Sequence, residues 1–410
     1  MRRTGIWAAL TTATFTGATL MAATPAHAQE LIADSGDTGW TLAATLIALL
    51  TLPGIALLYG NRQTDTAGGG AAQSLRTVFA SAAGVTLIWI LIGYSIAFSP
   101  TGGSWLGDGF NWMLNNLSTV RGDSTIAESS FVLFQLALAL IASLIAIGAV
   151  AGRVNAGWAA VFAALWSLLV YAPLAYWMWS GGWLANLGAI DGAGGIVVLI
   201  SAGSSALIAA MISGQTNVHN DVTEGDDSFW PLIGASLLSI GLLGVIGGAE
   251  FGATDDASMA ILNALASASA AALVWAGLAS RLSHAGTIGS GFLAGLAAAV
   301  ASAGFVSPGG AIIIGAVASL VSFFIARIMA GRLGRANAIF STFTVGAVIG
   351  ALMVAIFRDP ALGGTGYPSG MTTIGQIVAQ TIAVAIAGLW SIIGSLIVGY
   401  SAAIIWKPEN

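Results

Sequence analysis

Long apolar stretches, separated by short polar breaks, recur along the chain from about residue 39 to residue 404. A helix needs about 20 predominantly apolar residues to cross the hydrocarbon core of a bilayer, and the chain supplies that length eleven times. The predicted spans are 39–60, 75–98, 129–151, 155–178, 190–213, 229–249, 257–280, 284–304, 309–331, 335–357 and 374–404. The pattern predicts an all-α polytopic membrane protein with eleven transmembrane helices.

Composition supports a membrane setting. Over 410 residues the chain is 57% hydrophobic and 7% charged, with a mean hydropathy of +0.90, which excludes a water-soluble domain. There is no cysteine, and neither of the two histidines beyond the first 28 residues lies within an apolar run, so neither a metal site nor a cofactor is expected. The net charge of −5 gives no support to nucleic-acid binding.

The first residues have the features of a secretory leader. Arg2 and Arg3 precede an apolar run, and Ala26-His27-Ala28 has the small-x-small pattern of a cleavage site. We interpret 1–28 as a signal peptide and 37–406 as the membrane domain; an uncleaved first span is the alternative.

Basic residues fix the expected orientation. With the mature N-terminus outside, the inner loops and tail carry Arg62, Arg76, Arg153, Arg281, Arg327, Arg332, Arg335 and Lys407. The outer loops then carry only Arg121 and Arg358. Positively charged loops stay in the cytoplasm, so the N-terminus is expected outside and the C-terminus inside.

Glycine and proline indicate how the spans pack. The chain has 55 glycines, and pairs spaced four apart, such as Gly291 and Gly295, allow helices to approach closely. Pro53-Gly54 is expected to kink the first span, and the backbone groups released there need internal partners.

Several sequence blocks resemble, in order, those of the ammonium transporter (Amt/Rh) family. The blocks are Leu52–Gly60, Trp89 with Gly93–Phe98, Phe134-Gln135, Tyr171–Trp179 and Asp191–Gly195. The resemblance extends from about residue 37 to the C-terminus. It implies a homotrimer with one pore per subunit, each subunit built from two inverted five-helix repeats and one outer helix. An odd number of spans in a repeat inverts the second copy.

The resemblance also implies a route for ammonium or ammonia. Members of the family bind ammonium in an outer aromatic vestibule. The route then passes two stacked phenylalanines and an apolar pore lined by two histidines, along which ammonium is thought to lose its proton. In this chain Trp179 and Phe134 match vestibule aromatics, while Ala249 replaces the family's serine. Trp179 could equally be an interfacial tryptophan and Phe134 a packing residue.

The centre of the pathway departs most from the family. Leu138 and Val245 stand where the family stacks two phenylalanines. Leu199 stands at the first pore histidine and Phe343 at the second, and no histidine occurs in either helix. A histidine-pair mechanism is therefore excluded for this chain.

Two acidic residues lie near the expected entrance. Asp191 is interpreted as either an N-cap of the fifth span or a direct contact for the ion. Glu250 is either interfacial or part of the entrance lining. Because only Lys407–Asn410 follow the last span, a nitrogen-signalling protein is not expected as a partner.

Two functions remain open from the sequence. The first is a channel or transporter in a bacterial cytoplasmic (inner) membrane, with a degenerate pore for neutral ammonia or another small gas. The second is a non-conducting protein that binds, senses or assembles. An enzyme is not expected, because no nucleophile–base pair or metal cluster is evident.

Overall fold

The computed structural model describes residues 32–60, 69–122, 124–216, 229–282 and 288–408. The predicted signal peptide, with its cleavage site at Ala26–Ala28, lies outside this part of the chain. The compact unit described below comprises Ala33–Asn410.

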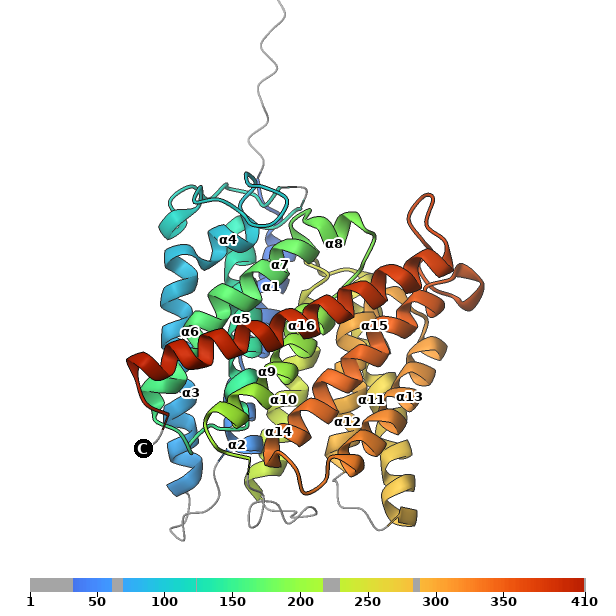
Figure 1. Ribbon diagram of the computed structural model, residues 1–410. Helices are drawn as coiled ribbons and strands as arrows, with labels where there is room; N and C mark the ends of the chain where they lie inside the picture. The colour runs from blue at the N-terminus through green and yellow to red at the C-terminus, as the bar shows by residue number, and fades with distance from the viewer. Residues whose placement is uncertain (1–31, 61–68, 123, 217–228, 283–287, 409–410) are drawn as a thin grey trace, which may run out of the picture. The chain divides into compact units, whose positions relative to one another are not determined.

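The described residues form sixteen α-helices and seven short π or 3₁₀ segments (Figure 1). In the first half they are α1 (Ser35–Ala48), α2 (Thr51–Tyr59), α3 (Gly69–Ile88), η1 (Trp89–Gly93), α4 (Tyr94–Phe98), η2 (Trp112–Leu114), α5 (Glu128–Gly148), α6 (Ala156–Trp166), η3 (Ser167–Tyr171), α7 (Ala172–Trp179), α8 (Trp183–Asn186), η4 (Gly195–Ile200) and α9 (Ser201–Ile212). In the second half they are α10 (Phe229–Gly248), α11 (Asp255–Leu282), α12 (Ile288–Ser302), η5 (Ala303–Phe305), α13 (Pro308–Ile328), α14 (Gly334–Ile339), η6 (Phe340–Thr344), α15 (Val345–Phe357), η7 (Pro360–Leu362) and α16 (Thr373–Ile405).

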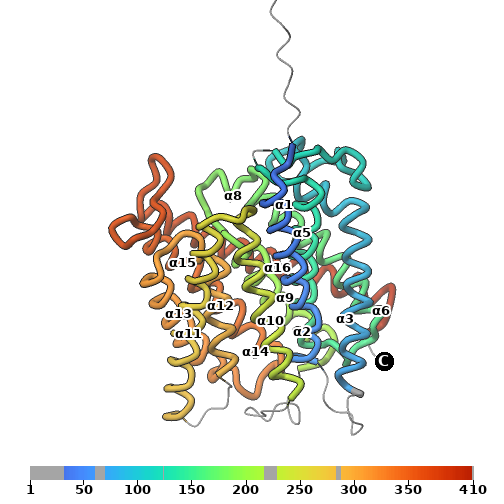
Figure 2. The backbone as a smooth tube through the Cα atoms, turned by 180° about the vertical axis from the view of Figure 1, so that it is seen from behind, coloured from blue at the N-terminus to red at the C-terminus, as the bar shows by residue number. Residues whose placement is uncertain are grey.

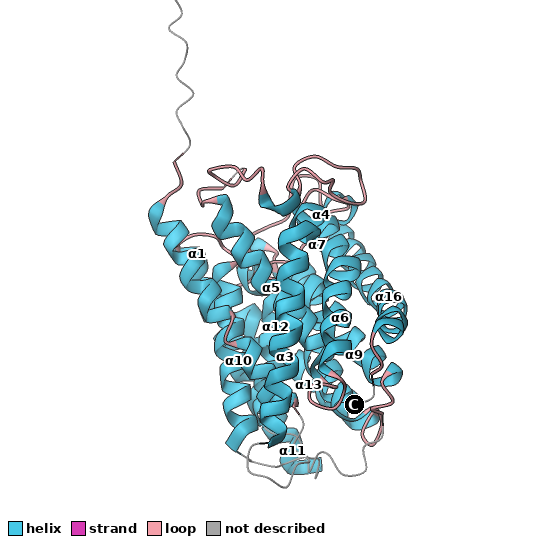
Figure 3. Ribbon diagram, turned by 90° about the vertical axis from the view of Figure 1, so that its left-hand side faces the viewer, coloured by secondary structure: helices cyan, strands magenta, loops and turns pink. Residues whose placement is uncertain are grey.

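Eleven helical stretches within the described residues are long and apolar enough to span a membrane, which confirms the predicted number. Most ends agree with the sequence pattern to within a few residues. The fifth span differs, because it begins at Gly195 and not near residue 190, so Asp191 lies in an irregular segment before it. The irregular segments lie mainly at the two ends of the helices (Figure 3).

Helix packing repeats with an offset of five spans. In the first half α3 packs on α6 and α5 on α9; in the second half α11 packs on α13 and α12 on α15. The second and fourth spans therefore pair as the seventh and ninth do, and the third and fifth as the eighth and tenth. Because each repeat has an odd number of spans, the two copies run in opposite senses. The eleventh span, α16, crosses the others obliquely (Figure 1).

The first span breaks at the predicted proline. Pro53 has no N–H for the carbonyl of Leu49, which instead accepts from the backbone N–H of Leu52 at 3.1 Å. The helix is interrupted there, between α1 and α2. Next to the break, a Cβ at Gly54 would lie 3.0 Å from the carbonyl oxygen of Gly234, so α2 and α10 cross at backbone contact. Figure 2 shows this pair from behind.

We call the ends of the spans at which α1 begins the N face, and the opposite ends the C face. The chain reaches residue 408 at the C face, where the N–H of Asn155 bonds the carbonyl of Pro408 at 3.0 Å. The segment that contains Asp191 lies at the N face.

Candidate functional site

The centre of the candidate pathway lies where the fifth span packs on the tenth. Both spans contain a π-helical segment at this level, η4 in the fifth and η6 in the tenth, and the two segments are in contact. Leu199 lies in η4 and Phe343 in η6. π-Helical turns are rare and frequently mark functional sites.

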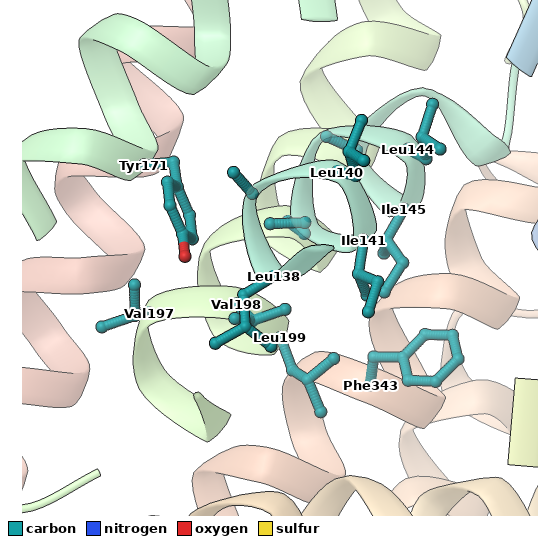
Figure 4. Packing of buried hydrophobic residues seen from close by; sticks show 14 of the residues in the cluster. Leu138, Leu140, Ile141, Leu144, Ile145, Tyr171, Val197, Val198, Leu199 and Phe343 are labelled. Atoms are coloured by element: carbon teal, nitrogen blue, oxygen red, sulfur yellow. The ribbon is translucent and has the colours of Figure 1, made fainter. Parts of the chain in front are cut away.

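Figure 4 shows Leu199 and Phe343 among closely packed, buried hydrophobic side chains, of which Tyr171 carries a hydroxyl group. Leu199 and Phe343 expose 0% of their surface, so no gap wide enough for a water molecule lies against them. Leu138 and Val245 are almost as buried, at 2% and 1%. The Phe343 ring makes an edge contact with Tyr59, with ring centroids 6.2 Å apart.

One glycine brings the fifth and tenth spans together next to this centre. A Cβ at Gly203, one turn beyond Leu199, would lie 3.3 Å from Cβ of Thr344 and would collide with its hydroxyl oxygen. The side chain of Thr344 therefore occupies the space that a larger residue at Gly203 would need. The two spans can approach at this level only because residue 203 has no side chain.

Asp191 caps the fifth span. Its Oδ2 accepts hydrogen bonds from the backbone N–H groups of Ile196 and Val197, both at 2.8 Å. These N–H groups belong to the first turn of η4, where no intrahelical acceptor exists. Its Oδ1 is buried and has no hydrogen-bond partner among the described residues. Asp191 thus has the capping function expected of an N-cap, although the N-cap residue itself is Gly194, three residues later.

The environment of Asp191 perturbs its ionisation. Burial raises the pKa of Asp191 from 3.8 to about 7, against the opposing effect of the backbone N–H groups of Val197 and Ile196. The carboxyl group therefore titrates near neutral pH.

The structure brings Trp179 and Asp191 together. The indole Nε1–H of Trp179 donates to the main-chain carbonyl of Asp191 at 2.9 Å. The ring lies beside Gly194, where a Cβ would be 3.5 Å from Cη2. Gly194 has φ of +101°, a conformation that disfavours other residues. Trp179 thus fixes the segment before the fifth span and leaves part of its ring exposed.

Phe134 occupies a different environment from Trp179. It is fully buried and packs edge to face against Phe251, with centroids 5.4 Å apart. Phe251 also contacts Phe131 at 5.3 Å. The ring of Phe251 therefore covers Phe134, and the contacts of Phe134 are packing contacts.

Glu250 lies at the N face, partly buried beside η5. A Cβ at Gly304 would lie 2.5 Å from Oε1 of Glu250. Burial raises the pKa of Glu250, and the negative charge of Asp256 raises it further. No group of three or more His, Cys, Asp and Glu side chains in the described part of the chain is placed to hold a metal ion.

Sequence comparisons decide the family. Residues 39–407 match the family model described as "Ammonium Transporter Family". An ammonium transporter of Aquifex aeolicus is 35% identical over 355 residues, which cover 83% of this chain and 81% of the relative. The chain belongs to the ammonium transporter family. Ammonium transporter Amt1 of Archaeoglobus fulgidus, another member, is 34% identical over 367 residues, covering 88% of this chain and 91% of that protein.

Solved structures of ammonium transporters agree in fold. The Mep2 structure of Saccharomyces cerevisiae matches with a TM-score of 0.79 at 24% identity, covering 92% of this chain and 88% of that one. A structure described as a sensor Amt protein also matches with a TM-score of 0.79, at 23% identity, covering 92% and 95%. The family is one of transporters, not enzymes.

Three residues near the site, Gln376, Gln380 and Tyr171, were not predicted as site residues from the sequence. Gln376 and Gln380, fully buried in α16, bond the backbone just before Asp191. Two glutamines four apart in an otherwise apolar helix were the available signal. Tyr171 is fully buried, its hydroxyl has no partner among the described residues, and Figure 4 shows it pointing toward Val197.

Proposed function

We propose that this protein conducts neutral ammonia, or another small gas, across the membrane. The proposal rests on the centre of the pathway, where η4, which contains Leu199, packs against η6, which contains Phe343. Neither side chain can accept, donate or relay a proton. Relatives named as ammonium transporters supply the substrate class.

The physical chemistry of the centre selects against charge. Moving an unpaired ion from water into a hydrocarbon environment costs many kcal/mol, whereas a small neutral molecule loses only its hydrogen bonds with water. Leu138 and Val245 are apolar and buried as well. Permeation is therefore expected to follow the concentration of neutral ammonia and to be insensitive to membrane potential.

The N face is suited to attract the cation before it loses a proton. The described residues there include the acidic side chains Asp34, Asp37, Asp108, Glu128, Asp191, Glu250, Asp255, Asp256 and Asp359. With only Arg121 and Arg358 as described basic residues there, the N face has a net negative charge, which raises the local concentration of cations. In this proposal Trp179 and Asp191 form the entrance subsite, and Phe134 supports it from below.

A second candidate function is a non-conducting family member that binds or senses solute at the N face. The closed packing of Leu199 and Phe343 favours it, because a water-sized molecule finds no gap beside these side chains. Conduction requires these side chains to move apart transiently.

We further propose the setting of the protein. The described basic residues of the C face are Arg76, Arg153, Arg281, Arg327, Arg332, Arg335 and Lys407, against Arg121 and Arg358 at the N face. This asymmetry supports an N-out, C-in orientation in a bacterial inner membrane. We also propose that the signal peptide is cleaved after residue 28, which N-terminal sequencing tests. We propose in addition that the protein is a homotrimer, which native mass spectrometry tests.

Uptake of ammonium and methylammonium, measured over a range of external pH in cells that lack their own ammonium transporters, tests the function. Uptake that rises with the neutral fraction supports an ammonia channel. Absence of uptake at every pH, with the protein inserted in the membrane, supports the non-conducting alternative.

A further inference from the structure

The segment Gly188–Gly194, here called the mouth segment, connects the fourth and fifth spans at the N face. It is not helical, so its backbone groups lack the regular partners that a helix provides. Three of its carbonyls accept hydrogen bonds from side chains of distant elements. The donors are Gln376 to Gly188, Gln380 to Ile190 and Trp179 to Asp191.

Gln380 recognises both backbone groups of one residue. Its Oε1 accepts from the N–H of Ile190 at 2.7 Å, and its Nε2 donates to the carbonyl of Ile190 at 2.9 Å. The same Nε2 donates to the carbonyl of Ala351 in α15 at 2.8 Å. One fully buried amide on the eleventh span therefore joins the mouth segment of the first repeat to the tenth span of the second.

Gln376, one turn earlier, extends this connection. Its Nε2 donates to the carbonyl of Gly188 at 2.8 Å, and its Oε1 accepts from Nη1 of Arg358 at 3.1 Å. The Arg358 guanidinium lies 5.5 Å from the ring centroid of Phe305. That ring in turn lies against the mouth segment, since a Cβ at Gly192 would be 3.1 Å from Cε2 of Phe305. The network thus encloses the mouth segment from two sides.

A helix that only covers the outside of the bundle does not need such groups. Apolar side chains would pack α16 against its neighbours without the cost of burying two amides. The side-chain amide of glutamine has both a donor and an acceptor, so it can bond a peptide N–H and C=O that would otherwise lack partners. Gln376 and Gln380 are therefore placed to bond the mouth segment.

We infer that Gln380 is a positioning residue of the eleventh span, which holds Ile190 and so sets the place of Asp191 and Trp179 at the entrance. Gln376 assists it through Gly188. The inference deepens the proposed function, since it concerns the entrance of the same pathway, and it predicts an effect on substrate entry more than on passage through the apolar centre.

The test replaces Gln380 with methionine, which has a similar shape and no amide. In the purified full-length protein, amide hydrogen exchange in 188–197 should become about tenfold faster, because the N–H of Ile190 loses its acceptor. Where transport is measurable, the KM for methylammonium should rise about fivefold with the maximal rate nearly unchanged. Because exchange is measured independently of transport, the inference about Gln380 can fail while the proposed function holds. The proposed function can likewise fail while the inference about Gln380 holds.

Ser391→Ala is the matched control. Ser391 is also fully buried in α16, but its hydroxyl bonds only the carbonyl of Ala387 in the same helix, at 2.6 Å. The control should leave exchange in 188–197 unchanged. If Q380M does not fold, Gln376→Met removes a single donor to the mouth segment and is measured in its place. Unchanged exchange in 188–197 in a folded glutamine variant would overturn the inference.

Discussion

The mouth segment and the centre of the pathway differ in polarity, although only a few residues separate them along the chain. The mouth segment, Gly188–Gly194, is irregular backbone whose carbonyls accept hydrogen bonds from Gln376, Gln380 and Trp179, and its Asp191 carboxylate caps the start of η4. A few residues later, Leu199 contributes only hydrocarbon to a fully buried centre. In the proposed function, the N face therefore positions and attracts a polar solute, while the centre admits only a molecule that can pass without hydrogen bonds.

This difference implies that selection and permeation depend on separate residues. Changes at the mouth should alter stability, pH dependence and substrate entry. Changes at the centre should alter the rate and the charge of what passes.

The buried carboxyl of Asp191 should make stability depend on pH. Its pKa is raised from 3.8 to about 7 in the folded protein, so the unfolded chain ionises first as pH rises. The contribution of Asp191 to the free energy of unfolding is therefore complete below about pH 4. It decreases between about pH 4 and pH 7, by about 4 kcal/mol in total. Unfolding of the purified protein across this range, compared with Asp191→Asn, measures the effect. The Asn variant should lack this fall; parallel pH profiles would show that Asp191 does not titrate there.

A side chain at Gly203 should force the fifth and tenth spans apart at the centre. Gly203→Ala places a Cβ against Thr344 and should destabilise the protein by about 2 kcal/mol. Gly277→Ala in α11 is the control, because a Cβ there meets nothing within 4 Å. Thermal unfolding of both variants is the measurement. Equal midpoints would mean that the close crossing at Gly203 does not constrain the centre.

Phe343 should be part of the permeation barrier. Phe343→His introduces a smaller, polar ring and should raise ammonia flux about tenfold, which corresponds to a barrier lower by about 1.4 kcal/mol. Phe343→Leu removes the ring without adding polarity, so the pair separates size from polarity. Flux is measured by stopped-flow alkalinisation of proteoliposomes. Unchanged flux in both variants would remove Phe343 as the barrier.

Trp179 should have the smallest effect, confined to the mouth. Trp179→Phe keeps an aromatic face and removes the N–H that bonds the carbonyl of Asp191. The apparent KM for methylammonium should rise about threefold, equivalent to about 0.7 kcal/mol, with the maximal rate preserved. A variant that lowers the maximal rate and leaves KM unchanged would place Trp179 in permeation and not in entry.

The sequence was sufficient for the features that depend on local composition. Apolar length located all eleven spans, Pro53 located the break between α1 and α2, and an aspartate before the fifth apolar run indicated a carboxylate that caps the helix. Glycine pairs such as Gly291 and Gly295 indeed lie against α11, where a Cβ at either position would collide with its residues. These outcomes follow from rules that act within a few residues.

Features that depend on contacts between distant segments of the chain could not be predicted from the sequence. The fifth span starts at Gly195 because Asp191 bonds Ile196 and Val197 across the irregular turn, which hydropathy cannot register. The cover of Phe134 by Phe251, and the pairing of Gln380 with Ile190, join elements far apart in the chain. The sequence showed the residue types but not their partners.

Simultaneous recording of current and internal pH in proteoliposomes exposed to an ammonium gradient tests the central claim most directly. An apolar centre formed by Leu199 and Phe343 predicts rapid internal alkalinisation, insensitive to membrane potential, with no protein-dependent current. A saturable inward current that grows with negative internal potential would show that charge crosses the centre and would contradict the account.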